Sequence, residues 1–293
     1  MEGNTIHSVS DYLSVVDRLK RQYPNNLVSN NPIYHQFLFR GHSDKRYKLL
    51  PGLFRTNGEH KEYLTWGTEQ NIINQFILEA SVYLKIPKDD YVTWLEYAQH
   101  YGVPTRLLDW TENPLVALYF ACKDKNDKDG EIWILNKINY NSYINKIDDS
   151  IFKIKLVKRE AVNSLFKNEF KPKYPFVYLP YYVDSRMSAQ SSFFMAWGTT
   201  ETPLEEMFSE EKNQMKIING NVGDDGFKSY ESARLDEFIM STIIPADRKQ
   251  AILHELDTIG INEKTLFPGI DGIGRYVERL YRFDFNEYLQ NML

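Results

Sequence analysis

The sequence contains a single cysteine, Cys122, among 293 residues. One thiol excludes an intramolecular disulfide and any zinc site built from cysteine clusters, and the six histidines show no metal-ligand spacing. No apolar stretch approaches the roughly 18 residues of a membrane-spanning helix, and the N-terminus lacks the basic and then apolar segments of a signal peptide. We therefore expect a soluble cytoplasmic protein without a metal or a membrane partner.

Several motifs of nucleotide-using and hydrolytic enzymes are also absent. The chain has no GxxxxGK[ST] or GxGxxG phosphate loop, no HExxH and no GxSxG. The net charge of −5 and the isoelectric point near 5.8 exclude a uniformly basic coat for nucleic acid. A local basic cleft is still compatible with that charge.

Aromatic and hydrophobic residues are plentiful, at 14% and 42% of the chain. This composition argues against disorder, and the length allows a sizeable core. No internal repeat or low-complexity segment interrupts the sequence. We expect a single domain over 1–293, with an N-terminal helical segment (1–30), a core (31–282) and an acidic, exposed excursion at 198–228.

Hydrophobic spacing predicts a mixture of helices and short strands. Helices are expected at 10–23, 68–85, 91–101, from 114 onward, at 248–256 and at 272–280. Strands are expected at 36–40, 106–110, 131–135 and in strand-like runs within 176–197 and 236–244. Strands with scattered helices of this kind indicate an α+β fold.

The segment YAQHYGVPTRLLDWTENPLVALYFA (97–121) concentrates polar side chains between apolar elements. Such groups need partners, because burying an unpaired polar group costs about 2–7 kcal/mol. One interpretation is structural, with an Arg106–Asp109 ion pair and Thr111 capping the helix that begins at Pro114. The other is a binding site, because capping requires one polar side chain and this segment supplies several.

Arg40 and Gly41 end a short apolar strand in FLFRGH (37–42). A guanidinium is a planar fork that matches phosphate oxygens, and a glycine lets a ligand approach the backbone closely. Together they could hold a diphosphate. The alternative is that Arg40 pairs with a carboxylate such as Asp109. The basic loop that follows, 45–55, either adds positive field or is simply solvated.

Two later segments carry further candidates. Gln190, in SRMSAQSSFFMAWG (185–198), has an amide that both donates and accepts, which suits a ribose hydroxyl or a base edge. A strand-edge glutamine is the structural alternative. The stretch 151–173 has seven Lys or Arg against two Glu, with interleaved aromatics. That pattern fits either a nucleic-acid backbone or an exposed helix.

Four segments, FLFRGH, QHYGVPTRLLDWTENPLVALYFA, SRMSAQSSFF and LFPGIDGIG, together resemble the FRG-domain family. The resemblance spans roughly residues 30–282, nearly the whole chain. Members of that family occur widely in bacteria and phages, and membership by itself implies no reaction.

A looser resemblance is to arginine-type ADP-ribosyltransferases. In those enzymes an early strand ends in Tyr-Arg-Gly, and a later strand ends in Ser-Thr-Ser before a helix with an Ala-x-x-Phe pattern. Residues 39–41 (FRG) are similar to the first element, and 109–111 (DWT), followed by Ala117 and Phe120, are similar to the second. Gln190 falls where a third strand carries the catalytic glutamate. Asp and Trp thus replace two serines, and Gln replaces the glutamate.

This second resemblance implies a fold, a substrate and roles for particular residues. The implied fold has an ADP-ribosyltransferase-like core of two small antiparallel or mixed sheets with flanking helices, and the implied substrate is NAD. The implied catalytic residues are Arg40, Asp109, Thr111 and Gln190. The implied NAD-binding residues are Arg40, Gly41, His42, His100, Tyr101, Arg106 and Trp110.

The implied activity is cleavage of NAD and transfer of ADP-ribose to a nucleic-acid base, a protein side chain or water, as in a bacterial toxin or phage-defence effector. Two alternatives stay open at the level of sequence. One is a non-catalytic nucleotide- or RNA-binding module, and the other is a structural interaction protein whose 97–111 polar cluster is an internal network.

Overall fold

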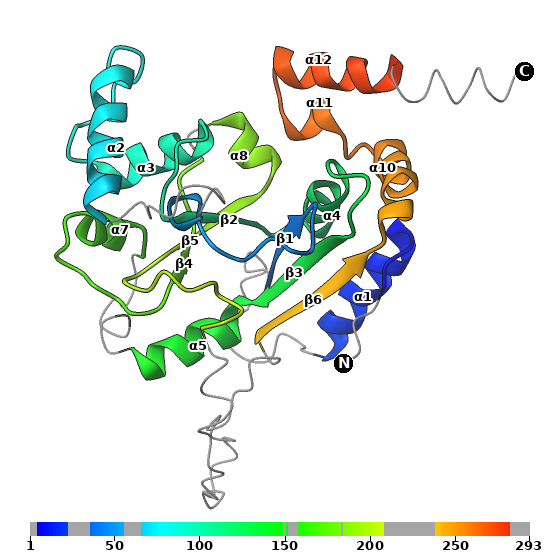
Figure 1. Cartoon of the computed structure of the whole chain (residues 1–293), viewed down its shortest axis with the longest axis horizontal. Helices are drawn as coiled ribbons and strands as arrows, with labels where there is room; N and C mark the ends of the chain where they lie inside the picture. Colours follow the sequence, from blue (N-terminus) through cyan, green and yellow to red (C-terminus); the bar gives the residue numbers. More distant parts are fainter. Residues whose placement is uncertain are drawn as a thin grey trace, which may run out of the picture.

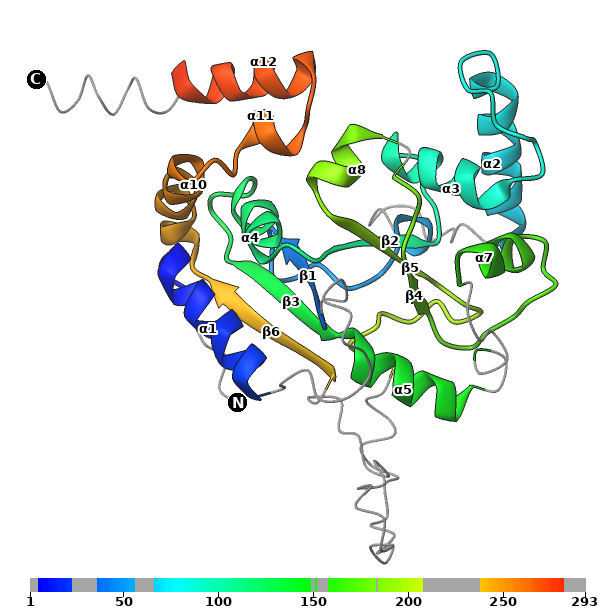
Figure 2. The same cartoon turned by 180° about the vertical axis from the view of Figure 1, so that it is seen from behind.

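A computed structural model describes residues 5–22, 36–55, 66–148, 151, 158–182, 184–207 and 238–281, and it has an α+β architecture. Six antiparallel strands form a sheet in the order β4-β5-β2-β1-β3-β6 (Figures 1 and 2). The strands are β1 (Phe37–His42), β2 (Leu107–Thr111), β3 (Gly130–Asn136), β4 (Phe176–Tyr178), β5 (Ser192–Ala196) and β6 (Ile239–Ile244).

The sheet has a narrow junction at its centre. β1 and β2 are joined by one residue pair, Phe39 with Thr111, whereas β1 pairs with β3 along its whole length and β2 pairs with β5 in the same way. Two three-stranded halves, β4-β5-β2 and β1-β3-β6, therefore meet at this point. The expectation of two separate small sheets is corrected accordingly, because the described strands form one six-stranded antiparallel sheet.

Helices flank both halves. Beside β1-β3-β6 lie α1 (Val9–Gln22), α4 (Pro114–Cys122) and α10 (Lys249–Thr258), and beside β4-β5-β2 lie α2 (Trp66–Ala80), α3 (Tyr91–His100) and α7 (Lys158–Phe166) (Figure 1). The other helical elements are α5 (Lys137–Ile147), α8 (Ser185–Ala189), α11 (Glu263–Leu266), α12 (Ile270–Arg279) and the 3-10 turns η1 (Gly52–Phe54) and η3 (Ala246–Arg248). α8 and α11 are in contact, and with α12 they occupy one end of the molecule (Figures 1 and 2).

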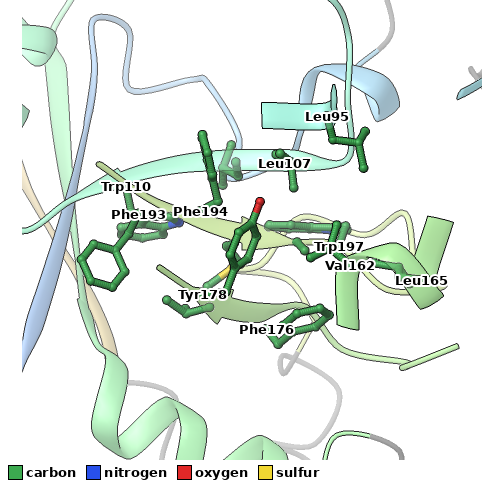
Figure 3. Packing of buried hydrophobic residues seen from close by; sticks show 14 of the residues in the cluster. Leu95, Leu107, Trp110, Val162, Leu165, Phe176, Tyr178, Phe193, Phe194 and Trp197 are labelled. Atoms are coloured by element: carbon green, nitrogen blue, oxygen red, sulfur yellow. The ribbon is translucent and has the colours of Figure 1, made fainter. Parts of the chain in front are cut away.

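The apolar core follows the two halves of the sheet. Phe37, Phe39 and Ile132 pack with the buried face of α4 in one cluster. A second cluster surrounds β2, β5 and β4 and includes Trp110 and Trp197, both at most 2% exposed (Figure 3). Each large apolar side chain buried in this way stabilises the fold by about 1.5–3 kcal/mol, so the buried aromatic side chains contribute substantially to stability.

Several sequence predictions of helices and strands are confirmed, and three need correction. α2 ends at Ala80 rather than at residue 85, and Tyr83, within the predicted helix, is 85% exposed. The strand-like run 176–197 contains the helix α8. Thr111 is not the cap of α4, because the Asn113 side chain accepts the Leu115 N–H at 3.0 Å.

Parts of the predicted N-terminal segment and excursion lie outside the described residues. These are 1–4 and 23–30 of the first, and 208–228 of the second. The described part of the N-terminal segment joins the sheet, since Thr5 forms a bridge with Ile243 of β6. None of the helices in the described ranges combines the length and hydropathy of a membrane-spanning segment.

Lys249 connects the C-terminal helices to the rest of the molecule. Its side chain is fully buried, and its ammonium donates hydrogen bonds to the backbone carbonyls of Ser43, Asp124 and Lys125 at 2.6, 3.0 and 3.0 Å. All three donors of the ammonium are therefore satisfied. This arrangement fixes the start of α10 against the end of β1 and the turn after α4.

Gly41 brings β1 against α4 with no room for a side chain. A Cβ at this position would overlap the carbonyl oxygen of Ala117 and would lie 2.6 Å from the amide nitrogen of Ala121. The glycine is thus required by a neighbouring helix backbone. This packing is a reason for the glycine that the sequence interpretation, based on a ligand, did not include.

We expect Gly41→Ala to lower the free energy of unfolding by at least about 2 kcal/mol, because the added methyl group forces two backbone segments apart. Gly274→Ala is the matched control, since nothing lies within 4 Å of a Cβ built there, and alanine is favoured over glycine in a helix by up to about 1 kcal/mol. Urea denaturation of both variants measures the difference. Wild-type stability of Gly41→Ala would contradict this account of the β1–α4 contact.

Candidate functional site

A cavity of about 360 Å³ lies at the junction of the two sheet halves. Both members of the joining pair, Phe39 and Thr111, line it. Its other walls come from β1, β2, the end of α3, α4, α8 with the start of β5, and the C-terminal segment 267–275. Segments distant in sequence therefore share one cavity, whose volume lies in the range of small-molecule sites.

Most of the residues singled out from the sequence line this cavity, and three do not. The lining residues among them are Arg40, Gly41, His100, Asp109, Trp110, Thr111 and Gln190. His42, Tyr101 and Arg106 lie elsewhere.

Arg40 is held at the cavity wall by its own half of the sheet and by the neighbouring half. Its Nε donates to Nε2 of His42 at 3.1 Å, and its Nη1 donates to the backbone carbonyl of Asp109. The Asp109 carboxylate is 3.7 Å away, and the Arg40 side chain is 16% exposed. Burial lowers the pKa of Arg40 to about 10, so the group stays charged at neutral pH and part of it faces the cavity.

His42 lies behind Arg40, so its predicted contact with a ligand is corrected. The imidazole is 4% exposed and accepts a hydrogen bond at Nε2, which requires the neutral form. Burial, with Arg40 and Arg55 nearby, lowers the pKa of His42 to about 3. His42 therefore orients the Arg40 guanidinium as a neutral acceptor.

Asp109 contributes a carboxylate to the cavity wall, and a chain of hydrogen bonds orients it. The Thr105 hydroxyl donates to Oε1 of Gln99 at 2.6 Å, which leaves the Gln99 amide to donate to Oδ2 of Asp109 at 2.7 Å. The Asp109 side chain is 52% exposed. Because Arg40 is beyond hydrogen-bond distance of this carboxylate, the two charges are close without forming a closed pair.

Thr111 and Gln190 also line the cavity and are joined by a hydrogen bond. The Thr111 hydroxyl donates to the Gln190 backbone carbonyl at 2.6 Å and accepts the Asn113 N–H at 3.0 Å. The Gln190 amide donates to the carbonyl of Leu266 at 3.0 Å. Thr111 thus positions Gln190, and Gln190 in turn connects the end of α8 to the end of α11.

Arg106 is a structural residue, which corrects its predicted role in binding. Its guanidinium and backbone N–H both bond the carboxylate of Glu69 on α2, with the backbone N–H at 3.0 Å and Nε at 2.6 Å, and both side chains are fully buried. The predicted Arg106–Asp109 pair is therefore wrong. The sequence could not reveal this partner, because Glu69 lies 37 residues away on α2, whereas Arg106 directly precedes β2.

The aromatic candidates divide into core, cavity and surface. The ring of Trp110 packs in the core between β2 and β5 (Figure 3). His100 lines the cavity 3.6 Å from Asp184, and burial lowers its pKa. Tyr101 is 63% exposed and contacts His100 edge-on with ring centroids 5.0 Å apart. Of these candidates, His100 and Trp110 both line the cavity, and His100 is the less buried of the two.

Three cations on the cavity wall were absent from the predicted binding residues. Arg186 comes from α8, Lys123 follows α4, and Arg275 comes from α12. Arg186 lies four residues before Gln190, in the segment 185–198 that was considered for Gln190. Its position there could have identified it from the sequence. Arg275 carried none, because its position depends on how α11 and α12 fold back towards α4.

The basic stretches noted in the sequence are neutralised in part. In the loop after β1, three basic residues contact a carboxylate, in the pairs Lys45–Asp129, Arg46–Asp44 and Lys48–Glu206 at 2.9, 2.6 and 2.9 Å, whereas Arg55 donates to the backbone carbonyl of Leu50 at 2.8 Å. In 151–173, Arg159 pairs with buried Glu96 at 2.8 Å, and residues 152–157 lie outside the described residues. Arg159 is therefore structural, and most of the charge in the loop after β1 is paired.

The fold and site define an α+β protein with a basic cavity at the narrowest point of an antiparallel sheet. Residues 35–130 match the family model of the FRG domain, which supports the resemblance to that family. The matched segment carries Arg40, Asp109 and Thr111, whereas Gln190, Arg186 and Arg275 lie beyond it. No curated protein and no solved structure matched the chain.

We expect Glu69→Leu to destabilise the protein by about 3–5 kcal/mol, because it leaves the buried Arg106 charge without its partner. The double variant Glu69→Leu/Arg106→Met should recover most of that loss, since apolar replacements of a buried pair are often neutral. Urea denaturation of the two variants provides the comparison. Equal stability of the single and double variants would show that the pair is not coupled.

His42 should make stability depend on pH. Because its folded-state pKa of about 3 lies below the ordinary value, the unfolded chain takes up a proton first as the pH falls. The stabilisation is complete above about pH 6.5 and is lost towards pH 3, by at most about 1.4 kcal/mol per pH unit.

We expect His42→Asn to flatten the pH dependence of the unfolding free energy in this window. His254→Asn, at an exposed histidine of α10, is the control and should follow the wild type. Chemical denaturation at a series of pH values measures both slopes. A wild-type slope for His42→Asn would contradict the assignment.

Proposed function

We propose that the protein is an enzyme of the ADP-ribosyltransferase type, which cleaves NAD and transfers ADP-ribose to an acceptor. The observation that carries this proposal is the convergence of Arg40, Asp109, Thr111 and Gln190 on one cavity. These residues come from β1, β2 and the C-cap of α8, and they lie up to 150 positions apart, between Arg40 and Gln190. Packing alone gives no reason for their polar groups to meet at an opening.

Arg40 is suited to the NAD diphosphate. Its charge is retained, its orientation is set by His42 and by the Asp109 carbonyl, and its pairing with the Asp109 carboxylate is incomplete. A ligand phosphate can therefore bind the guanidinium without first breaking a closed ion pair. His100, on the same wall, offers a ring against which nicotinamide or adenine could stack.

Asp109 is the group we assign to the reacting ribose. When the bond between ribose and nicotinamide breaks, the electron pair leaves with nicotinamide and the ribose carbon becomes cationic. A carboxylate held in place by Gln99 stabilises that cation electrostatically until the acceptor attacks. Gln190 is less suited to this role, because it is neutral and its amide already bonds the Leu266 carbonyl.

The sheet geometry also supports the proposal. The resemblance implied an NAD cleft between two separate small sheets. The described strands form one sheet instead, and the cavity lies where its two three-stranded halves meet at the narrow β1–β2 junction. The acceptor is a nucleic acid or a protein under this proposal, and the biological setting would be a bacterial toxin or a phage-defence effector.

The competing proposal is a nucleotide- or RNA-binding module without chemistry. Arg186 and Arg275 favour it, because both line the cavity and neither has a carboxylate within ion-pair distance among the described residues. The ion pairs of Lys45, Arg46 and Lys48 in the loop after β1 weigh against a long nucleic-acid track. A module of this kind would bind with a steep dependence on salt concentration.

We expect purified protein incubated with labelled NAD and cell lysate to release nicotinamide. Asp109→Asn should lower kcat by about a hundredfold or more, because an amide removes the negative charge from the site. Arg40→Ala should raise KM and lower kcat, since it removes the diphosphate contact. Chromatography of the released nicotinamide measures all three proteins.

Asp127→Asn is the matched control, since this exposed aspartate contacts only its neighbour Lys128 among the ion pairs of the described residues, and it should keep wild-type activity. A wild type that releases no nicotinamide would overturn the enzymatic proposal. Asp109→Asn that loses stability and no activity would instead indicate an internal structural network.

A further inference from the structure

A second cavity of about 170 Å³ adjoins the first at its C-terminal wall. Arg186, Phe267 and Arg275 line both cavities. The rest of the smaller cavity is formed by residues 268–271, which lead into α12. The two spaces are therefore contiguous, with these three side chains between them.

The two arginines lie against the same aromatic ring. The guanidinium carbons of Arg186 and Arg275 are 4.9 and 4.5 Å from the centroid of Phe267. Neither guanidinium has a carboxylate within 4.0 Å in the described part of the chain, whereas Arg106 and Arg159 each have one. Nε of Arg186 is buried and has no hydrogen-bond partner within the described ranges.

This arrangement leaves positive charge uncompensated. Two like charges near one ring repel each other, and a cation–π contact is a weak substitute for an ion pair. Asp271 also lines the smaller cavity, but no ion pair joins it to either arginine among the described residues. Gly269 gives α12 no side-chain cap, so the positive end of that helix adds to the field.

An anion in this cavity would meet donors from two directions. Two guanidinium forks on different elements can together supply several N–H groups. A tetrahedral phosphate, with three exposed oxygens, can accept from both forks at once, whereas a carboxylate has two oxygens in one plane. The donor set therefore favours phosphate over an acidic side chain.

We propose that Arg186 and Arg275 form a phosphate-binding subsite at a position separate from Arg40. The inference deepens the proposed function and rests on it only for the identity of the ligand in the larger cavity. The phosphate belongs either to the dinucleotide itself or to a phosphorylated acceptor such as a nucleic-acid strand. In the second case the acceptor is a nucleic acid rather than a protein.

Inorganic pyrophosphate is the direct probe of this subsite. Titration calorimetry at constant ionic strength should show that Arg186→Gln and Arg275→Gln each weaken its binding about tenfold or more. Arg18→Gln, at an exposed arginine of α1, removes the same charge and should leave the affinity unchanged. Circular dichroism checks that every variant is folded.

Three results would overturn the subsite. The first is pyrophosphate binding that is undetectable in the wild type or equal in all variants. The second is tighter binding of a polyglutamate peptide than of pyrophosphate. The third is that Arg186→Gln no longer weakens pyrophosphate binding when Arg40 is also replaced by Gln. That result would mean that Arg40 and Arg186 bind the same phosphate.

Two ligands distinguish the sources of the phosphate. Weaker binding of NAD by Arg186→Gln and Arg275→Gln assigns the subsite to the dinucleotide. A loss confined to a 5′-phosphorylated tetranucleotide, with its unphosphorylated counterpart unaffected, assigns it to the acceptor. No loss with either ligand overturns the proposal.

The test of the phosphate subsite can fail or succeed independently of the test of the proposed enzymatic activity. A pyrophosphate effect without nicotinamide release would overturn the enzyme and leave the subsite in place. If nicotinamide release depends on Asp109 but Arg186→Gln and Arg275→Gln change the binding of none of these ligands, the enzyme is supported and the subsite is overturned.

Discussion

The contact between β1 and α4 determines where the candidate site lies. Because Gly41 allows the strand backbone to touch the helix backbone, Arg40 is held at one fixed depth beside the junction of the sheet. The single pair between Phe39 and Thr111 then brings the end of β2, with Asp109, to the same place. A wider β1–β2 ladder would close this region with backbone hydrogen bonds, and a looser β1–α4 contact would let Arg40 move. The site therefore depends on tight packing on one side of β1 and sparse pairing on the other.

The fully buried cations of the protein have partners for their charge, whereas two of the four cations on the cavity wall do not among the described residues. Arg106 and Arg159 are each matched by a buried glutamate, and Lys249 is matched by three carbonyls. Such matching is expected wherever a charge leaves water, because the desolvation cost is otherwise several kcal/mol. Arg186 and Arg275 lack that compensation in the described part of the chain. The charges of these two guanidinium groups are therefore available to an anionic ligand in the cavity.

Local sequence patterns were sufficient to predict much of the fold. Hydrophobic spacing gave α1, α3 and α4 nearly to the residue, and turn residues bounded β1, β2 and β3. Pairings across the chain were not accessible, since nothing near Arg106 indicates Glu69 rather than Asp109 as its partner. Gly41 shows a different limit. Either a ligand or a helix backbone close to residue 41 would require a residue without a side chain. The sequence therefore showed that something approaches this position closely but did not show what it is. Arg275 was missed because an exposed helix offers no sign of the cavity it borders.

The Lys249 ammonium has a consequence for when the cavity becomes complete. It fastens α10 to the chain near Ser43 and Asp124, and the wall carrying Phe267 and Arg275 follows directly from that helix. A nascent polypeptide in which α10, α11 and α12 have not yet been made would already contain Arg40 and Asp109 but would lack this wall. The cavity is thus completed only after α12 has been translated, so a cell that makes the protein is exposed to a finished pocket only from that point.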